Sequence, residues 1–115
     1  MLATVINATI FSQVLEQAGI QTQVFSSLSV PKLADNFSPK KAQQALHDGK
    51  VVFCAGGTGH PFFSTDTAAA QKALELGCDV VVKATKVDGV YDKDPVKYSD
   101  AVKFDTITLQ EAQER

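Results

Sequence analysis

The sequence predicts an α/β fold with a mainly parallel sheet. Two short and almost wholly apolar runs, residues 50–55 and 79–82, are typical of strands that are covered on both faces. An alanine-rich helical segment, residues 66–76, lies between these runs and ends at Gly77. Because a strand, a helix and a strand in this order form a right-handed crossover, we expect the two strands to be parallel neighbours.

The residues before this unit predict two more helices and another strand. Residues 2–18 carry apolar side chains at mostly three- and four-residue intervals and then reach a glycine, which predicts an amphipathic helix. Residues 23–25 are β-prone and predict a short strand. Ser38 and Pro39 are typical of an N-cap and a first helical turn, so we expect a helix from there to Gly49.

Two turn signals follow the second apolar run. Asp88 and Gly89 stand between two valines and predict a two-residue hairpin of type I′, in which Gly89 takes a positive φ. Thr108, followed three residues later by Glu111, predicts a capping box at the start of a last helix.

Composition narrows the classes of function. The chain has 115 residues, 44% of them hydrophobic and 21% charged, as in an ordinary globular domain. A net charge of −2 gives no case for nucleic acid or an anionic membrane as the main partner, and no apolar run approaches the roughly 20 residues of a membrane span. Cys54 and Cys78 lie in or beside apolar segments, without metal-ligand spacing. We expect two free, buried thiols in a reducing cytoplasm, with a disulfide or redox role as the alternative.

The stretch AGGTGHPFFSTD, residues 55–66, leaves the carboxyl end of the first apolar strand and leads into a helix. Ligands of open α/β sheets bind beyond the carboxyl ends of the strands, and a helix N-terminus there favours phosphate. Glycines allow close backbone approach, hydroxyls can donate hydrogen bonds, and two phenylalanines could form an apolar wall beside a planar base. The residues concerned are Gly56, Gly57, Gly59, Thr58, Ser64, Thr65, Phe62 and Phe63. The alternative is a structural turn with an ordinary helix cap and two core phenylalanines, since neither common phosphate fingerprint is present.

Lys83 directly follows three valines of the second apolar run. We expect its ammonium group at the same edge of the sheet, where a lysine can neutralise charge on a phosphoryl group in transfer. The alternative is a solvated lysine at a strand end, followed by a hairpin of mixed charge.

Two long motifs carry a resemblance. TGHPFFSTDTAA, and KATKVDGVYDKDP from Lys83 onward, resemble segments of the bacterial uridylate kinases, a branch of the amino acid kinase family. The likeness extends from MLATVIN to TLQEA. It implies a three-layer αβα fold with a mainly parallel sheet, the carbamate kinase-like fold. It further implies transfer of the γ-phosphoryl group of ATP to UMP with Mg²⁺, in the cytoplasm, by a homohexamer.

Carried over position by position, the resemblance implies ATP contacts at Thr85, Tyr91 and Asp94. Asp66 matches an acidic residue of the catalytic centre, where it would orient lysines rather than act as a base, and Lys83 is the second catalytic candidate. No protein ligand to a metal is expected. The implied UMP site comprises Thr58, Gly59, His60, Pro61, Phe62, Phe63, Ser64 and Thr65. The family loop usually reads TGNPFF, and His60 replaces its asparagine with a bulkier, titratable ring.

The family also begins with a Lys-x-Ser-Gly strand and a Gly-Gly-Gly phosphate loop, and neither stands in this sequence. We therefore expect residues 1–115 to form one partial, incomplete amino acid kinase domain that is inactive alone. A non-catalytic nucleotide-binding protein of the same fold, of the molybdenum-storage type, is the alternative, which the intact UMP loop disfavours. A kinase acting on carbamate, glutamate or aspartate is a third possibility, which the paired phenylalanines disfavour.

Overall fold

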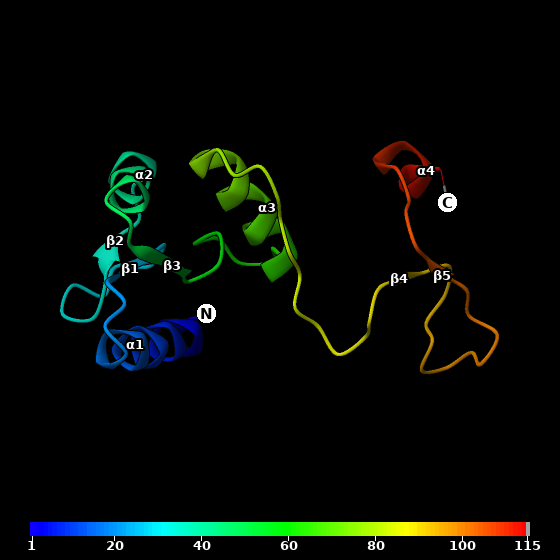
Figure 1. Cartoon of the computed structure of the whole chain (residues 1–115), viewed down its shortest axis with the longest axis horizontal. Helices are drawn as coiled ribbons and strands as arrows, with labels where there is room; N and C mark the ends of the chain where they lie inside the picture. Colours follow the sequence, from blue (N-terminus) through cyan, green and yellow to red (C-terminus); the bar gives the residue numbers. More distant parts are fainter. Residues whose placement is uncertain (115) are drawn as a thin grey trace. The chain divides into compact units, whose positions relative to one another are not determined.

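The structure is a computed structural model that describes residues 1–114, and the chain divides into two compact units at Val81–Val82 (Figure 1). The first unit contains α1 (Leu2–Gln17), β1 (Thr22–Ser26), β2 (Asp35–Asn36), α2 (Pro39–His47), β3 (Val51–Ala55) and α3 (Thr65–Leu76). The second contains β4 (Val90–Tyr91), β5 (Lys103–Phe104) and α4 (Leu109–Gln113).

The sheet of the first unit has the strand order β2-β1-β3, and both neighbouring pairs are parallel. β1 and β3 pair along their whole length, from Thr22 opposite Val51 to Ser26 opposite Ala55. Helix α2 connects them, so β1, α2 and β3 form a parallel crossover unit. The predicted parallel sheet is confirmed, although the partner of β3 is β1.

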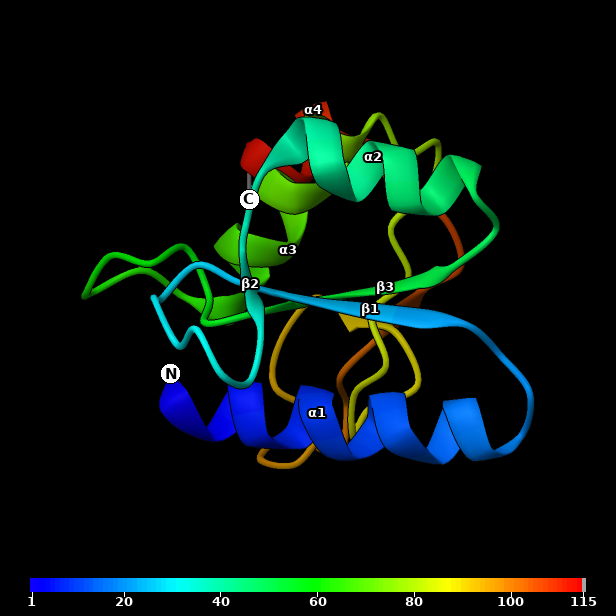
Figure 2. The same cartoon turned by 90° about the vertical axis from the view of Figure 1, so that its left-hand side faces the viewer.

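Alternate residues of β1 and β3 face two different helix layers, as expected for strands. One apolar cluster lies between the sheet and α1, and the other lies between the sheet and α2, with the end of α3 beside it (Figure 2). The predicted three-layer αβα arrangement is therefore confirmed. The first cluster contains Val5, Ala8 and Ala55 with Val24 and Phe53 against them, and the second contains Phe25, Ala42 and Ala45 with Phe37, Val52 and Leu76.

Helix α1 turns only part of its apolar surface to the sheet. Val5 and Ala8 are buried, whereas a second row of large apolar side chains on α1 is between 54% and 63% exposed. We call this row the α1 stripe; it consists of Leu2, Ile6, Ile10, Phe11 and Val14. Among residues 1–114, no helix has the length and apolar character needed to cross a bilayer.

The predicted helix signals are confirmed at the ends of α3 and α4. The Ser64 hydroxyl accepts a hydrogen bond from Thr67 N at 3.1 Å, and Gly77 ends α3 in the left-handed conformation with φ 70°. Thr108 and Glu111 form the predicted capping box of α4. The predicted helices at residues 2–18 and from Pro39 onward are present as α1 and α2.

The predicted strand at residues 79–82 is wrong, and so is its pairing with β3. This run forms no strand, and Val80, Val81 and Val82 are 73%, 57% and 86% exposed. A strand exists only where a neighbour accepts its backbone hydrogen bonds, and in the described chain β3 pairs with β1 alone. The apolar composition of residues 79–82 therefore indicated a tendency to form a strand, but no strand of the described chain pairs with them.

The predicted hairpin at Asp88–Gly89 is also wrong. Val90 pairs with Phe104 and Tyr91 with Lys103, in an antiparallel pair that spans a longer loop. Gly89 does not take a positive φ. A Cβ placed on Gly89 would lie 2.6 Å from Cε of Lys103, so the absence of a side chain there makes room for that lysine.

The two cysteines are free, as predicted, but both are exposed rather than buried. Cys54 borders a hollow of about 260 Å³ under α3, which leaves its sulfur accessible. Partial desolvation is still the main cause that raises the pKa of the Cys54 thiol, and the charge of Lys72 opposes it. The thiol is therefore expected to be protonated at neutral pH.

Substitution of Phe25 by alanine should test the core. Phe25 is fully buried, with its ring edge-on to Phe37 at 6.3 Å between centroids. Because a large cavity would remain, we expect Phe25→Ala to lower the free energy of unfolding by about 3–5 kcal/mol, measured by urea denaturation. Phe63→Ala is the control, since Phe63 is 63% exposed and lies outside the α1 stripe. Equal losses in the two variants would contradict this packing.

Candidate functional site

The candidate site lies where β1, β2 and β3 end together at one edge of the parallel sheet. The β3–α3 loop, residues 56–64, starts at this edge and leads to the N-terminus of α3. Parallel strands end at a common edge, which is the place where open α/β sheets bind ligands. The structure therefore puts the predicted glycine segment at the position expected of a binding loop.

Three left-handed glycines shape the start of the loop. Gly56, Gly57 and Gly59 have φ values of 80°, 62° and 80°. Gly59 N donates to Gly56 O at 3.2 Å and closes a tight turn. Gly56 N donates to the Thr4 hydroxyl at 2.9 Å, which ties the turn to α1. The first hydrogen bond closes the turn on itself, and the second attaches it to α1.

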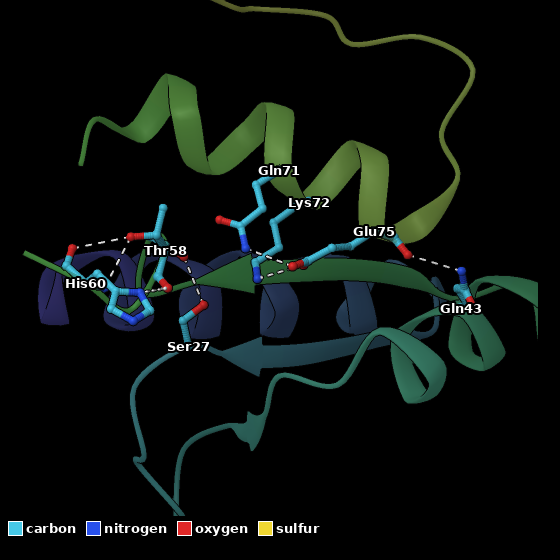
Figure 3. A network of polar contacts seen from close by, with 8 residues as sticks. Ser27, Gln43, Thr58, His60, Gln71, Lys72 and Glu75 are labelled. Atoms are coloured by element: carbon cyan, nitrogen blue, oxygen red, sulfur yellow. Dashed lines mark hydrogen bonds and ion pairs between the residues drawn. The ribbon is translucent and has the colours of Figure 1, made fainter.

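Thr58 and His60 are joined by local hydrogen bonds (Figure 3). His60 N donates to Oγ1 of Thr58 at 3.1 Å, and Nδ1 of His60 lies 3.2 Å from the Thr58 carbonyl oxygen. The imidazole edge contacts the Phe63 ring, with 6.5 Å between centroids. His60 is therefore positioned by its neighbours within the loop and is exposed.

The alternative of two core phenylalanines is wrong. Phe62 is fully exposed, Phe63 is 63% exposed, and Phe62 has a positive φ of 69°. A bulky residue in the left-handed region costs on the order of 1–3 kcal/mol and is found mainly at functional sites. The exposure and the strain both favour a role in recognition over a role in packing.

The loop ends in the first turn of α3. Ser64 is occupied as the N-cap, and its hydroxyl also lies 2.9 Å from Oγ1 of Thr67. Thr65 and Asp66 are the first two helical residues and are exposed. Asp66 stands in the positive end of the helix dipole, where a carboxylate is stabilised. Thr65 borders the hollow under α3, where its hydroxyl is available to a ligand.

Two hollows flank the loop. Gly57 and Thr65 border the hollow of about 260 Å³ under α3. Thr58 borders a second hollow of about 390 Å³ on the other side, lined by Ser26, Ser27, Ser29, Asn36, Phe37 and Lys72. We call this second space the serine hollow. Its lining offers hydroxyl groups, the amide of Asn36 and the ammonium of Lys72, and no carboxylate.

Lys72 borders both hollows from α3. Its ammonium lies 3.1 Å from Oε2 of Glu75 and 3.4 Å from the centroid of the Phe37 ring. Gln71 donates to the other oxygen of Glu75, and the Glu75 carbonyl accepts from Gln43 of α2 (Figure 3). The hydrogen bond from Gln71, followed by that from Lys72, lowers the pKa of Glu75. The Lys72 charge is thus held by a carboxylate and an aromatic face.

In the second unit, the predicted residues Lys83 and Thr85 border one hollow of about 450 Å³ together with Asp88 and Gly89. The strand whose end was expected to present Lys83 does not form, so Lys83 lies in a segment without secondary structure. The structure nevertheless brings Lys83 and Thr85 to a common concave surface.

Tyr91 and Asp94 belong to two local hydrogen-bonded groups. The Tyr91 hydroxyl donates to Asp88 at 2.6 Å, and Lys103 donates to the other Asp88 oxygen at 2.9 Å. Asp94 accepts from Val96 N at 3.0 Å and starts a turn. Tyr91 is thus bonded to Asp88, which lines the same hollow as Lys83. Asp94 instead stabilises a local turn.

Sequence reasoning missed Thr4, Ser26, Ser27 and Lys72. Thr4 lies 52 positions before Gly56, and only the fold brings the two together, whereas Lys72 follows the motif within α3 and carries no signal of its own. Ser26 and Ser27 had a usable signal, because two hydroxyls directly follow the β-prone run that became β1. The ends of all parallel strands, and not only the one before a glycine run, are therefore informative.

The sequence model of the amino acid kinase family matches residues 1–115. The chain belongs to the amino acid kinase family. Two uridylate kinases are among its relatives: that of Wolinella succinogenes is 49% identical over 112 residues, and that of Paramagnetospirillum magneticum is 50% identical over 111. These matches cover 97% and 96% of this chain and 46% of each relative.

Two solved structures of UMP kinases are similar to this chain. The UMP kinase from Ureaplasma parvum matches with a TM-score of 0.89 and 32% identity, covering 99% of this chain and 49% of that one. The UMP kinase from Bacillus anthracis matches with a TM-score of 0.79 and 31% identity, covering 87% and 42%. This amino acid kinase chain spans about half the length of the relatives that it matches.

The Asp88 group gives a pH prediction for the second unit. Hydrogen bonds from Tyr91 and then Lys103 lower the pKa of Asp88 from 3.8 to about 2. Since the folded pKa is below the ordinary value, the carboxylate stabilises the fold fully above pH 4 and loses this effect as the pH falls toward 2.

We expect an NMR titration of the Asp88 carboxyl carbon to give a midpoint near 2. In Lys103→Met the midpoint should move toward 3.8, because one donor is removed. An Asp88 midpoint near 3.8 in the unchanged chain would contradict the hydrogen bonds described.

Proposed function

We propose that the protein containing this chain is a UMP kinase, which transfers the γ-phosphoryl group of ATP to a phosphate oxygen of UMP and yields ADP and UDP. The observation that carries the proposal is the β3–α3 loop: a strained, exposed loop at the carboxyl edge of a parallel sheet, in a chain half identical to uridylate kinases. Because the chain spans about half of those relatives, the activity is proposed for the whole protein.

UMP is proposed to bind at residues 58–65. The exposed rings of Phe62 and Phe63 can stack on the uracil base, which would offset the cost of their exposure. The Thr58–His60 turn offers polar groups to the base edge, and the hollow beside Thr65 and the positive end of α3 can receive the sugar and phosphate.

ATP is proposed to bind in the second unit. Lys83 and Thr85 border its hollow, and the Lys83 ammonium would neutralise charge on the phosphoryl group in transfer. Tyr91 and Asp94 are proposed as further ATP contacts, with Tyr91 placed by Asp88. Asp66 is proposed to orient cationic groups of the catalytic centre, since it is an exposed carboxylate in the first turn of α3.

Mg²⁺ is proposed to enter with ATP. Among residues 1–114, no group of three or more His, Cys, Asp or Glu side chains gathers to hold a metal ion. Mg²⁺ commonly keeps several water ligands and takes phosphate oxygens of a nucleotide. The residues present therefore fit a metal ion that arrives bound to ATP. The positive charge of this ion would stabilise the negative charge that develops on the phosphates.

Binding experiments on Thr65 and Thr85 test the two assignments. We expect Thr65→Ala to weaken UMP by roughly 3- to 10-fold, more if the hydroxyl meets phosphate, and to leave ATP unchanged. Thr85→Ala should show the reverse pattern. Both nucleotides would be titrated into labelled chain and followed by amide chemical shifts.

The pair of variants is its own control, because each threonine reports on the other site. In the unchanged chain, UMP should shift amides of residues 57–66 and CMP should do so more weakly. Equal losses for both nucleotides in both variants, or UMP shifts confined to other residues, would refute the assignment.

We also propose that the protein works in the cytoplasm as a homo-oligomer, a hexamer in its complete form. The α1 stripe supports assembly, because it is an apolar row that the sheet does not cover. Cell fractionation that recovers the protein with membranes or outside the cell would contradict the location.

Sedimentation equilibrium tests the assembly. We expect the double variant Ile6→Glu/Ile10→Glu to be monomeric at concentrations where the unchanged chain associates, because charges would be placed in the apolar contact. Leu33→Glu is the control, since Leu33 is 55% exposed but lies outside α1. An unchanged mass for the double variant would exclude the α1 stripe as the contact.

A further inference from the structure

Ser27 lies directly after β1 and bonds to the end of β3 through its backbone and to the β3–α3 loop through its side chain. Its amide N donates to Ala55 O at 3.0 Å, and its hydroxyl donates to Gly57 O at 2.9 Å (Figure 3). The first bond extends the parallel pairing of β1 with β3 by one step. The second leaves the sheet and holds the second residue of the loop.

The loop packs closely on Ser26 and Ser27, so a Cβ on Gly56 or Gly59 would force its neighbours to move by a few tenths of an ångström. A Cβ on Gly59 would lie 3.0 Å from the Ser27 carbonyl oxygen and 3.3 Å from Ser27 Cβ. A Cβ on Gly56 would lie 3.1 Å from the Ser26 hydroxyl and 3.2 Å from Ser27 N. Gly56 and Gly59 therefore allow the loop to pack against the end of β1, and both also take the left-handed conformation.

The hydrogen bond from Ser27 fixes the orientation of one peptide group. The described chain has no cis peptide, so the Gly57 C=O and the Thr58 N–H point in opposite directions. Holding Gly57 O toward Ser27 therefore turns Thr58 N–H away from Ser27. It also sets the direction in which the Thr58 side chain leaves the backbone. The Thr58 hydroxyl in turn accepts a hydrogen bond from His60 N.

A left-handed glycine peptide is easily reoriented, because glycine has little preference between positive and negative φ. Without the Ser27 hydroxyl, the Gly57–Thr58 peptide would lose the side-chain bond that selects one orientation. Ordering it would then be a cost of ligand binding, which lowers affinity.

We propose that Ser27 is a positioning residue for the UMP site: its hydroxyl selects the Gly57–Thr58 peptide orientation that presents Thr58 and His60 to the base. This inference rests on the proposed function. Ser27 acts through the loop and need not touch the nucleotide.

Three variants test the role of the hydroxyl. Ser27→Ala removes it, Ser27→Thr keeps it, and Ser29→Ala removes another hydroxyl from the lining of the same serine hollow. We expect Ser27→Ala to weaken UMP by roughly 3- to 10-fold, while Ser27→Thr and Ser29→Ala stay within about 2-fold of the unchanged chain.

Amide hydrogen exchange without nucleotide supplies the second measurement. In Ser27→Ala, the Gly59 amide, which donates to Gly56 O within the turn, should exchange several-fold faster, and amides of the β1–β3 pair should keep their rates. Gly59→Ala should cost more stability than Gly49→Ala. Both glycines have positive φ, but a Cβ on Gly49 meets nothing within 4 Å.

The two measurements separate the positioning role from the proposed function. Unchanged loop exchange in Ser27→Ala would overturn the positioning role whether or not UMP binds. Equal loss of UMP affinity in Ser27→Ala and Ser27→Thr would also overturn it. If the unchanged chain fails to bind UMP but the loop exchange rises in Ser27→Ala, the substrate assignment fails and the positioning of the loop stands.

Discussion

The parallel pairing of β1 with β3 is the constraint on which the rest of the first unit depends. Five residue pairs, from Thr22–Val51 to Ser26–Ala55, fix both the register and the common end of the strands. Since side chains alternate along a strand, this register sends Phe25 and Val52 to the α2 layer and Val24 and Phe53 to the α1 layer. A slip by one residue would invert both cores and separate Ser27 from the β3–α3 loop.

Local signals predicted the helices well, because their causes lie within a few residues. Ser64 caps α3 by bonding Thr67 N, and Thr108 and Glu111 bond each other; each signal and its effect belong to the same turn. The apolar runs predicted strands less well. Residues 51–55 form one because β1 accepts their hydrogen bonds, whereas Val80 to Val82 have no strand beside them. Strand pairing depends on two segments together, so neither segment alone predicts it.

The candidate site shows the same division. The glycine motif could be placed at a sheet edge from sequence, since a strand before it and a helix after it leave little choice. The exposure of Phe62 and Phe63 could not be predicted from the sequence, because two adjacent aromatic residues are equally compatible with a buried core. The contact of Ser27 with Gly57 joins residues that are 30 positions apart, and only the β1–β3 register brings them together.

Phe62 has a consequence for how such a chain evolves. Its left-handed backbone suits glycine or asparagine, and its fully exposed ring gains nothing from the fold. Selection for stability alone would therefore drive phenylalanine out of this position within few mutational steps. The phenylalanine at this position therefore has no explanation in the packing of the described chain. Position 62 is thus a place where the backbone conformation and the residue present disagree, and a more stable version of this chain would carry another residue there.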